Sequence, residues 1–300
     1  MEEPRKIQTE EPPPAEADTT LPFPFNQHNY CNYEPIEKQI DAVRVLVVDS
    51  LLRDEDDLSD VARNEWGKAA SLEIKRERRI AGMAMENIVS NVERLVKNPS
   101  TEVAPLASIA GASAKFKPDA IVLSGTLRDF DFYNPAVIET FSEFIKTNKI
   151  PVLAICGGHQ LVGLSFGARV MTLDRLEQHE QRENRPLEYQ YRFIRITEPN
   201  DPIFKGMPGR VLRVWQNHGL QLDRVPEGFE LLATSYLCRN QMMVKRSDGQ
   251  LIYTVQFHLE KSFEDWNKSR TRWEHQNESR DGRMLFENFL KLALNNSPGN

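Results

Sequence analysis

The sequence predicts an α/β fold with a mostly parallel central sheet, helices on both faces of the sheet and a small antiparallel extension. Strand and helix signals alternate along the chain, which is typical of a parallel sheet covered on both faces. Towards the C-terminal end, short apolar segments follow one another closely, with turn signals such as Asp248-Gly249 between them. These closely spaced segments predict the antiparallel strands.

Each strand is expected where a short apolar run ends at polar or turn residues. These runs lie near 43–49, 119–123, 150–155, 192–196, 211–215, 230–233, 241–246 and 251–257. Helices are expected where apolar residues recur at three- and four-residue spacing, near 65–97, 135–147, 158–166 and 281–294. No apolar run reaches the roughly 18 residues of a membrane-spanning helix.

The chain divides by composition into a tail and one domain. Residues 1–38 are rich in Pro and Glu at their start, which predicts a disordered or extended segment whose aromatic residues dock on the chain itself or on a partner. Residues 39–296 are expected to form a single domain. Two stretches read as insertions: a strongly helical one at about 54–100, and one at about 261–281, expected to form a lid, a partner-docking surface or a small satellite core.

Composition narrows the classes of function. The chain has 300 residues, of which 40% are hydrophobic, enough to bury a sizeable core. A net charge of −6 argues against nucleic acid as a main partner and against a basic membrane-binding face. The three cysteines are far apart, which indicates a reducing, cytoplasmic compartment. No Cys/His set has zinc-site spacing, so no metal and no cofactor are expected.

Cys156 lies between a predicted strand and a predicted helix. The apolar run 150–155 ends at this cysteine, Gly157 and Gly158 follow, and a helical apolar pattern comes next. This order is that of a nucleophile elbow, a strained turn that presents a reactive side chain beyond the sheet edge. The start of the helix favours a thiolate at the sulfur. A buried structural cysteine before a glycine turn is the alternative interpretation.

A candidate base occurs about a hundred residues later. His258 ends another apolar run, and Glu260 follows it at the second position. A cysteine nucleophile needs a base to accept its proton, and the base needs a group that fixes its tautomer. Residues two apart share a face in an extended chain, so Glu260 can orient His258 while the other ring nitrogen faces Cys156.

Taken together, these motifs resemble the class I glutamine amidotransferases. The chain has Ala154-Ile-Cys-Gly-Gly-His-Gln160 and Val255-Gln-Phe-His-Leu-Glu260 where that family has Gly-Ile-Cys-x-Gly-x-Gln and Val-Gln-Phe-His-Pro-Glu. The stretch Val214-Trp-Gln-Asn-His-Gly219 is similar to one in the amidotransferase domain of GMP synthetase. The resemblance spans roughly residues 43–294 and implies a flavodoxin-like fold.

The resemblance also implies a reaction and a set of site residues. Cys156, His258 and Glu260 would hydrolyse the glutamine side-chain amide through a γ-glutamyl thioester, and ammonia would pass to a separate ATP-dependent synthetase. Backbone N–H groups at Gly125 and Gly157 would hold the oxyanion. The residues implied to bind the small-molecule substrate, glutamine or a γ-glutamyl compound, are Gln160, Asn217 and His218.

One departure from the family pattern leaves other functions open. The oxyanion loop reads Ser124-Gly-Thr-Leu-Arg128 rather than Ser-Gly-Gly-Pro, and Thr126 does not readily adopt positive φ. Ala154 and Leu259 also replace a family glycine and proline, with smaller expected effects. The alternatives are a stand-alone γ-glutamyl hydrolase or peptidase of the same fold, and a catalytically degenerate regulatory homologue.

Overall fold

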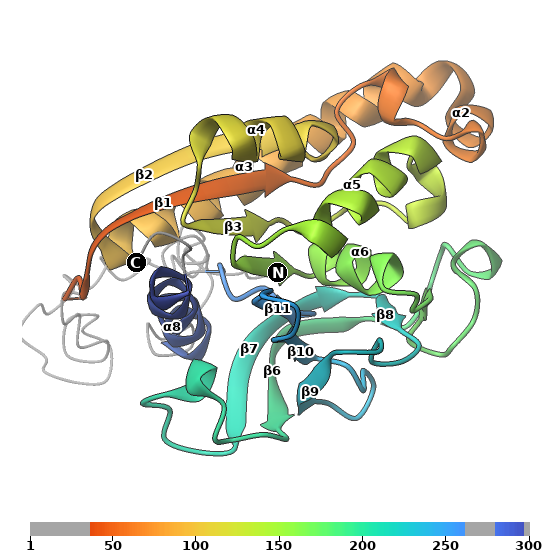
Figure 1. The fold of residues 1–300 in the computed structure, drawn as a ribbon. Coiled ribbons are helices and arrows are strands. Elements are labelled where there is room, and N and C mark those ends of the chain that lie inside the picture. Colours follow the sequence, from red (N-terminus) through yellow and green to blue (C-terminus); the bar gives the residue numbers. More distant parts are fainter. Residues whose placement is uncertain (1–36, 262–279, 297–300) are drawn as a thin grey trace, which may run out of the picture. The chain divides into compact units, whose positions relative to one another are not determined.

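In a computed structural model of the chain, residues 37–261 and 280–296 are described. All of them belong to one compact unit, Pro35–Asn300. A nine-stranded sheet with the strand order β2-β1-β3-β4-β11-β10-β9-β6-β7 runs through this unit (Figure 1). The predicted tail and the insertion at about 261–281 lie wholly or almost wholly outside the described residues.

Five strands form the parallel half of the sheet. Within this half, every pair of neighbouring strands is parallel. All of them except the edge strand β2 bury apolar residues on both faces, which is why these inner strands read as apolar runs in the sequence. These strands are β1 (Ile40–Asp49), β2 (Val96–Pro105), β3 (Ala120–Leu123), β4 (Val152–Ile155) and β11 (Ile252–Val255).

The predicted antiparallel extension is present and continues the same sheet beyond β11. Its four strands pair antiparallel with one another and with β11. They are β6 (Glu188–Ile196), β7 (Val211–His218), β9 (Glu230–Thr234) and β10 (Met242–Lys245). Strands β5 (Val170–Thr172) and β8 (Leu220–Leu222) form a separate antiparallel pair. In Figure 1 this extension lies below the parallel strands.

Helices cover both faces of the parallel half, as predicted. Residues of α3 (Ala70–Leu95) and α8 (Arg280–Asn295) pack with Val45 and Val47 in one core. Residues of α4 (Ile109–Phe116), α5 (Pro135–Thr147) and α6 (Gly157–Ser165) pack with Leu46 and Val48 in the other. Successive residues of β1 thus face opposite cores, because side chains alternate along a strand.

The helix expected over 65–97 differs from the observed structure. Helix α2 (Asp60–Trp66) ends at Gly67, whose φ of 47° is outside the helical range. A short 3-10 turn (Gly67–Ala69) leads into α3, and residues from Val96 onwards form strand β2. Strand β2 lies at the edge of the sheet and most of its residues are not buried. It therefore lacks the apolar run that marks the inner strands.

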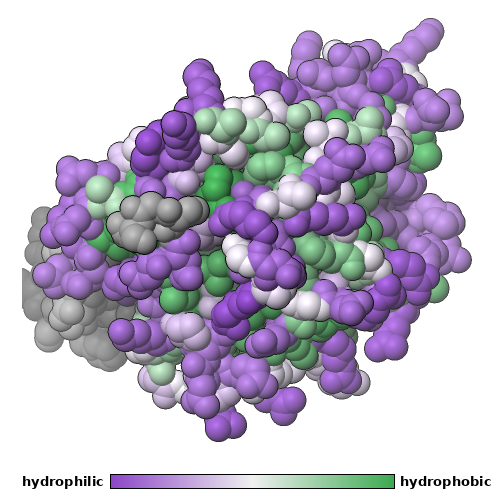
Figure 2. All heavy atoms as spheres, viewed as in Figure 1, coloured by the Kyte–Doolittle hydropathy of each residue, from purple (hydrophilic) through white to green (hydrophobic). Residues whose placement is uncertain are grey.

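One face of the described residues is mainly polar. Figure 2 shows one face dominated by hydrophilic residues, with apolar residues in small groups between them. Within the described residues, no helix combines the length and apolarity needed to cross a bilayer. The helices of this unit instead bury one side against the sheet.

Candidate active site

Cys156 lies where strand β4 ends and helix α6 begins. Its backbone has φ 50° and ψ −106°, a conformation that non-glycine residues adopt only when the surrounding structure imposes it. The Cys156 N–H donates a hydrogen bond to the Val255 carbonyl oxygen at 2.7 Å, so the end of β11 holds the turn. The turn thus has the strained backbone that the sequence predicted, and it brings β4 and β11 to the same sheet edge.

The two glycines after Cys156 allow the loop that follows β3 to pack against the start of α6. A Cβ added at Gly157 would lie 2.4 Å from the backbone nitrogen of Thr126. A Cβ added at Gly158 would lie 2.8 Å from the carbonyl oxygen of Ser124. Both distances are too short for any side chain, so the loop 124–126 and the elbow fit together only because these positions are glycine.

His258 and Glu260 follow strand β11 and are hydrogen-bonded to each other. The distance from His258 Nδ1 to Glu260 Oε1 is 2.7 Å. The His258 backbone N–H donates to the Trp215 carbonyl oxygen at 2.8 Å, which ties the histidine to β7. From α3, the Asn91 side chain donates to the Glu260 carbonyl oxygen at 2.7 Å. Three elements therefore fix the position of this pair.

The imidazole of His258 and the side chain of Cys156 meet against Gly125. A Cβ built on Gly125 would lie 3.4 Å from Cys156 Cβ and 3.4 Å from His258 Cε1. Burial of the ring opposes its charged form. The Glu260 carboxylate and the Cys156 sulfur nevertheless raise the pKa of His258 well above its ordinary value of 6.5. This arrangement favours an imidazolium beside the sulfur, which can donate a proton to a leaving group.

A second histidine near the elbow does not meet the requirements of a base. His159 is fully buried in α6, and its Nδ1 lies 2.7 Å from Thr254 Oγ1. Burial and the neighbouring His218 lower the pKa of His159 to about 3. His159 therefore stays neutral at ordinary pH and serves the packing between α6 and β11.

The side-chain amide of Gln160 is hydrogen-bonded within the protein. Its Nε2 donates to the Leu220 carbonyl oxygen and to Gln256 Oε1, both at 3.0 Å. Gln256 in turn places its own Nε2 at 3.7 Å from Cys156 Sγ. Gln256 was not identified as a site residue from the sequence. It lies two residues before His258, and a polar residue that faces the same side as His258 in an apolar run was a usable signal. The two amides form a chain that ends at the sulfur.

His218 and Asn217, at the end of β7, have different surroundings. Asn217 is exposed, whereas His218 is buried. His218 Nδ1 lies 2.9 Å from the Leu220 carbonyl oxygen, and His218 Nε2 lies 3.0 Å from Glu188 Oε2. Both ring nitrogens thus contact protein groups. Any contact of His218 with a ligand would have to use its ring carbons or its backbone.

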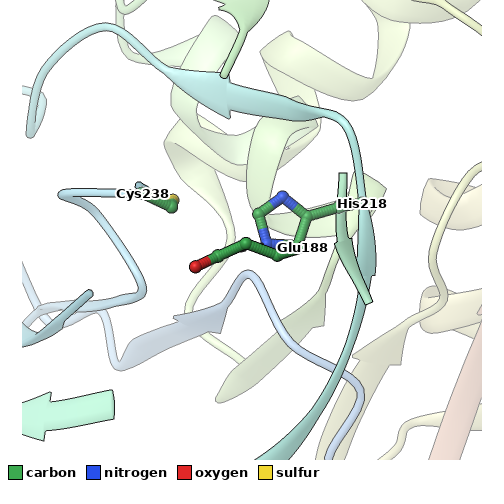
Figure 3. A group of neighbouring side chains, drawn as sticks. All are labelled: Glu188, His218 and Cys238. Atoms are coloured by element: carbon green, nitrogen blue, oxygen red, sulfur yellow. Dashed lines mark hydrogen bonds and ion pairs between the residues drawn. The ribbon is translucent and has the colours of Figure 1, made fainter. Parts of the chain in front are cut away.

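Glu188, His218 and Cys238 form a buried cluster (Figure 3). Glu188 also accepts from Ser235 Oγ at 2.9 Å and from Gln241 Nε2 at 2.7 Å. Burial opposes ionisation of Glu188, but these hydrogen bonds and the one from His218 lower its pKa. The Cys238 thiol donates to a backbone carbonyl, and burial raises its pKa far above the usual range. The same atoms that a metal would need are therefore engaged in hydrogen bonds that join β6, β7 and the segment 235–241.

A large open cleft of about 1030 Å³ lies beside Cys156 and His258. Helix α3, the loop 124–129, the segment 182–187 and the end of β7 line it. Of the residues expected at the site, all but Gly157 line the cleft: Gly125, Cys156, Gln160, Asn217, His218, His258 and Glu260. The helical insertion predicted at about 54–100 thus forms one wall of the cleft.

The part of the cleft wall formed by the segment 182–187 is held by ion pairs. Arg185 Nη1 donates to Asp129 Oδ1 at 2.8 Å, and Arg182 Nη2 donates to Asp131 Oδ2 at 2.6 Å. These side chains are largely buried, so the contacts are less screened by water than a surface pair would be. The polar segment 177–185 is therefore fastened to the residues that follow the loop 124–128.

Comparison with known proteins relates the sequence to a family. The sequence model of the family "Glutamine amidotransferase class-I" matches residues 84–275, more than half of the chain. The chain is 37% identical over 145 residues to a glutamine-hydrolyzing GMP synthase subunit of Thermococcus kodakarensis, covering 48% of this chain and 67% of that protein. The corresponding protein of Methanothermobacter thermautotrophicus is 32% identical over 151 residues, covering 50% and 65%.

Two solved structures share the fold. A putative GMP synthase subunit from Thermoplasma acidophilum superposes with a TM-score of 0.52 at 22% identity, covering 84% of this chain and 94% of that one. A glutamine amidotransferase from Thermotoga maritima superposes with a TM-score of 0.50 at 19% identity, covering 84% and 98%. At these identities the likeness concerns the fold. The extent of the family match and the elbow–histidine geometry together show that this chain belongs to the class I glutamine amidotransferases.

Proposed function

We propose that this protein hydrolyses the side-chain amide of glutamine through a cysteine thioester and supplies the ammonia to an ATP-dependent synthetase on a separate chain. The meeting of Cys156 and His258 against Gly125, with Glu260 hydrogen-bonded to His258, carries this proposal. The relatives described as glutamine-hydrolyzing support it. Residues 39–296 would form the amidotransferase domain, with the insertions at about 54–100 and 261–281.

The first half of the proposed reaction forms the thioester. The Cys156 sulfur attacks the carbonyl carbon of the glutamine side chain, and the carbonyl oxygen becomes an oxyanion. Backbone N–H groups at Gly125 and Gly157 would hold that oxyanion. His258 then gives its proton to the amide nitrogen, the C–N bond breaks, and ammonia leaves. Glu260 holds the imidazole in the orientation that this transfer needs.

The second half releases glutamate. Neutral His258 takes a proton from a water molecule, and the resulting hydroxide attacks the thioester carbonyl carbon. The C–S bond breaks and the sulfur leaves as the thiolate, which restores the starting pair. One water and one glutamine are consumed for each glutamate and ammonia. Gln160 and Asn217, on the cleft wall, would hold the rest of the substrate, while His218 shapes that wall.

Glutamate release by the isolated protein tests the proposal. We expect glutamine hydrolysis by the wild type and a loss of at least ~10³-fold in kcat for Cys156→Ser, because removing one member of such a unit typically costs orders of magnitude. A folded wild-type protein that releases no glutamate, with or without a synthetase, contradicts the proposal. Turnover of γ-glutamyl conjugates but not of glutamine would select the γ-glutamyl hydrolase alternative.

A further inference from the structure

The side chain of Arg128 joins the loop after strand β3 to helix α3. Its Nε donates to Glu77 Oε2 at 3.1 Å, and its Nη2 donates to Glu73 Oε2 at 2.9 Å. The guanidinium also lies over the Trp66 ring, 4.9 Å from the ring centroid. A planar guanidinium can donate to two carboxylates at its edge while its face stacks on an aromatic ring. Arg128 is thus held from three sides by the helical insertion.

Glu77 is a fixed anchor for this contact. Its side chain is fully buried, and its second oxygen accepts from the Leu52 backbone N–H at 2.9 Å. Burial raises the pKa of Glu77, whereas the Leu52 N–H and the Arg128 guanidinium favour the ionised carboxylate. A buried carboxylate is tolerated only when it is paired and hydrogen-bonded. The position of α3 relative to Arg128 is therefore closely determined.

Arg128 comes three residues after Gly125 and two after Thr126, the residues that face the elbow. The loop lacks the second glycine and the proline of the family pattern, so the rigid φ of proline is missing here. Loop residues that stabilise a transition state must be held within about 0.5 Å of the productive geometry. The contact between Arg128 and α3 lies next to this loop and can restrain it in addition to the packing against Gly157 and Gly158.

We propose that Arg128 and Glu77 are positioning residues: their ion pair makes helix α3 the support that fixes the oxyanion loop Ser124–Leu127 against Cys156. This inference rests on the proposed function, since it concerns the loop that would hold the oxyanion. It assigns a role to the helical insertion, which no part of the proposed reaction uses directly. Neither residue touches the reacting atoms; both act through the backbone of the loop.

The decisive variant removes the ion pair between Arg128 and Glu77 without leaving Glu77 charged and unpaired, while Glu73 keeps its ion pair with Arg76. Arg128→Met alone would leave the Glu77 carboxylate buried without its charged partner. Breaking a buried pair in this way is strongly destabilising. The double variant Arg128→Met/Glu77→Gln avoids this problem. We expect its kcat for glutamine hydrolysis to fall by about 10- to 100-fold, because small misplacements of a stabilising group have effects of this size.

A reaction of the same sulfur that needs no oxyanion separates positioning from general damage. Alkylation of Cys156 by iodoacetamide is a displacement at a saturated carbon, so no oxyanion forms. We expect the alkylation rate of the double variant to stay within about 2-fold of wild type while kcat falls, since only the oxyanion step depends on the loop. Equal losses in both rates would mean that the whole site is disturbed and would overturn the positioning role.

Arg246 provides a matched control. Its guanidinium pairs with Asp201 and Glu230, lies over the Tyr253 ring at 5.3 Å, and its side chain is 33% exposed, against 27% for Arg128. The side chain of Asp201 is buried, as that of Glu77 is. This cluster lies near the start of β11, whereas His258 follows the end of that strand. The variant Arg246→Met/Asp201→Asn should therefore keep wild-type kcat.

Loop order can be measured independently of activity. In the wild type, amide order parameters of Gly125, Thr126 and Leu127 should be close to the rigid value of about 0.85, and in the Arg128→Met/Glu77→Gln variant they should fall below about 0.6. Unchanged order parameters and amide chemical shifts in a folded double variant would overturn the inference. If the wild type releases no glutamate, the proposed function fails, and the NMR result still decides whether α3 fixes the loop.

Discussion

The variant Gly157→Ala perturbs the contact between the elbow and the oxyanion loop by a known amount. The added Cβ would lie 2.4 Å from the Thr126 backbone nitrogen and 2.0 Å from its Oγ1. Ordinary contacts of a Cβ begin at 3.4 Å, so the loop backbone must move by about 1 Å. A displacement of that size in a catalytic site can lower the rate by about 10²-fold.

We therefore expect kcat for glutamine hydrolysis to fall by about 100-fold in Gly157→Ala, measured by coupled glutamate detection. Adding Thr126→Gly should not restore activity, because it removes the hydroxyl clash but leaves the backbone nitrogen in the way. Full rescue by Thr126→Gly would show that the loop backbone is not the critical neighbour.

Gly82 in α3 supplies the control, since a Cβ added there meets nothing within 4 Å. Gly82→Ala should keep wild-type kcat and stabilise the protein by up to about 1 kcal/mol, because alanine has the higher helix propensity. Wild-type kcat in Gly157→Ala, with an intact fold in thermal unfolding, would refute the link between loop position and rate.

Three further predictions concern His258, Glu260 and the two buried thiols. First, the pKa of His258, followed by NMR titration, should fall in Cys156→Ala, because the Cys156 sulfur is one of the groups that raise it. Because that pKa is raised in the folded state, the charged ring contributes its full stabilisation below about pH 6.5 and loses it as the pH rises through the folded-state pKa. The wild type should therefore lose more stability over that pH range than Cys156→Ala does. Equal titration curves for the two proteins would contradict this. Second, Glu260→Gln should lower kcat less than His258→Ala does, since Glu260 only orients the ring; equal losses would reverse that assignment. Third, peptide mapping after brief treatment of the folded protein with iodoacetamide should show label on Cys156 and none on Cys238, whose burial raises its pKa; label on both would mean that the Cys238 environment opens.

Local sequence patterns predicted the central part of the fold. Val45–Val48 is continuously apolar because both faces of β1 are covered. Strand β2 was missed because it is an edge strand whose exposed residues carry no apolar pattern, and because it directly follows the periodic residues of α3. Strands β5 and β8 are three residues each, too short to produce a periodic signal.

The candidate site likewise contains some residues that the sequence predicted and others that it did not. Cys156, His258 and Glu260 were foreseeable because each follows an apolar strand, and neighbouring parallel strands end at one sheet edge. The ion pair between Arg128 and Glu77 joins residues 51 positions apart, and such a pairing leaves no local pattern in one sequence. The buried Glu188 cluster was missed for the same reason, since its members come from separate strands and loops.

Trapping the covalent intermediate tests the central claim most directly. Wild-type protein is mixed with glutamine, quenched in acid, digested and examined by mass spectrometry, with Cys156→Ser treated in parallel. We predict a mass increase of one γ-glutamyl group on the peptide that contains Cys156, and no such adduct in the variant. Glutamate release without any adduct on Cys156, or an adduct on another residue, would contradict the account.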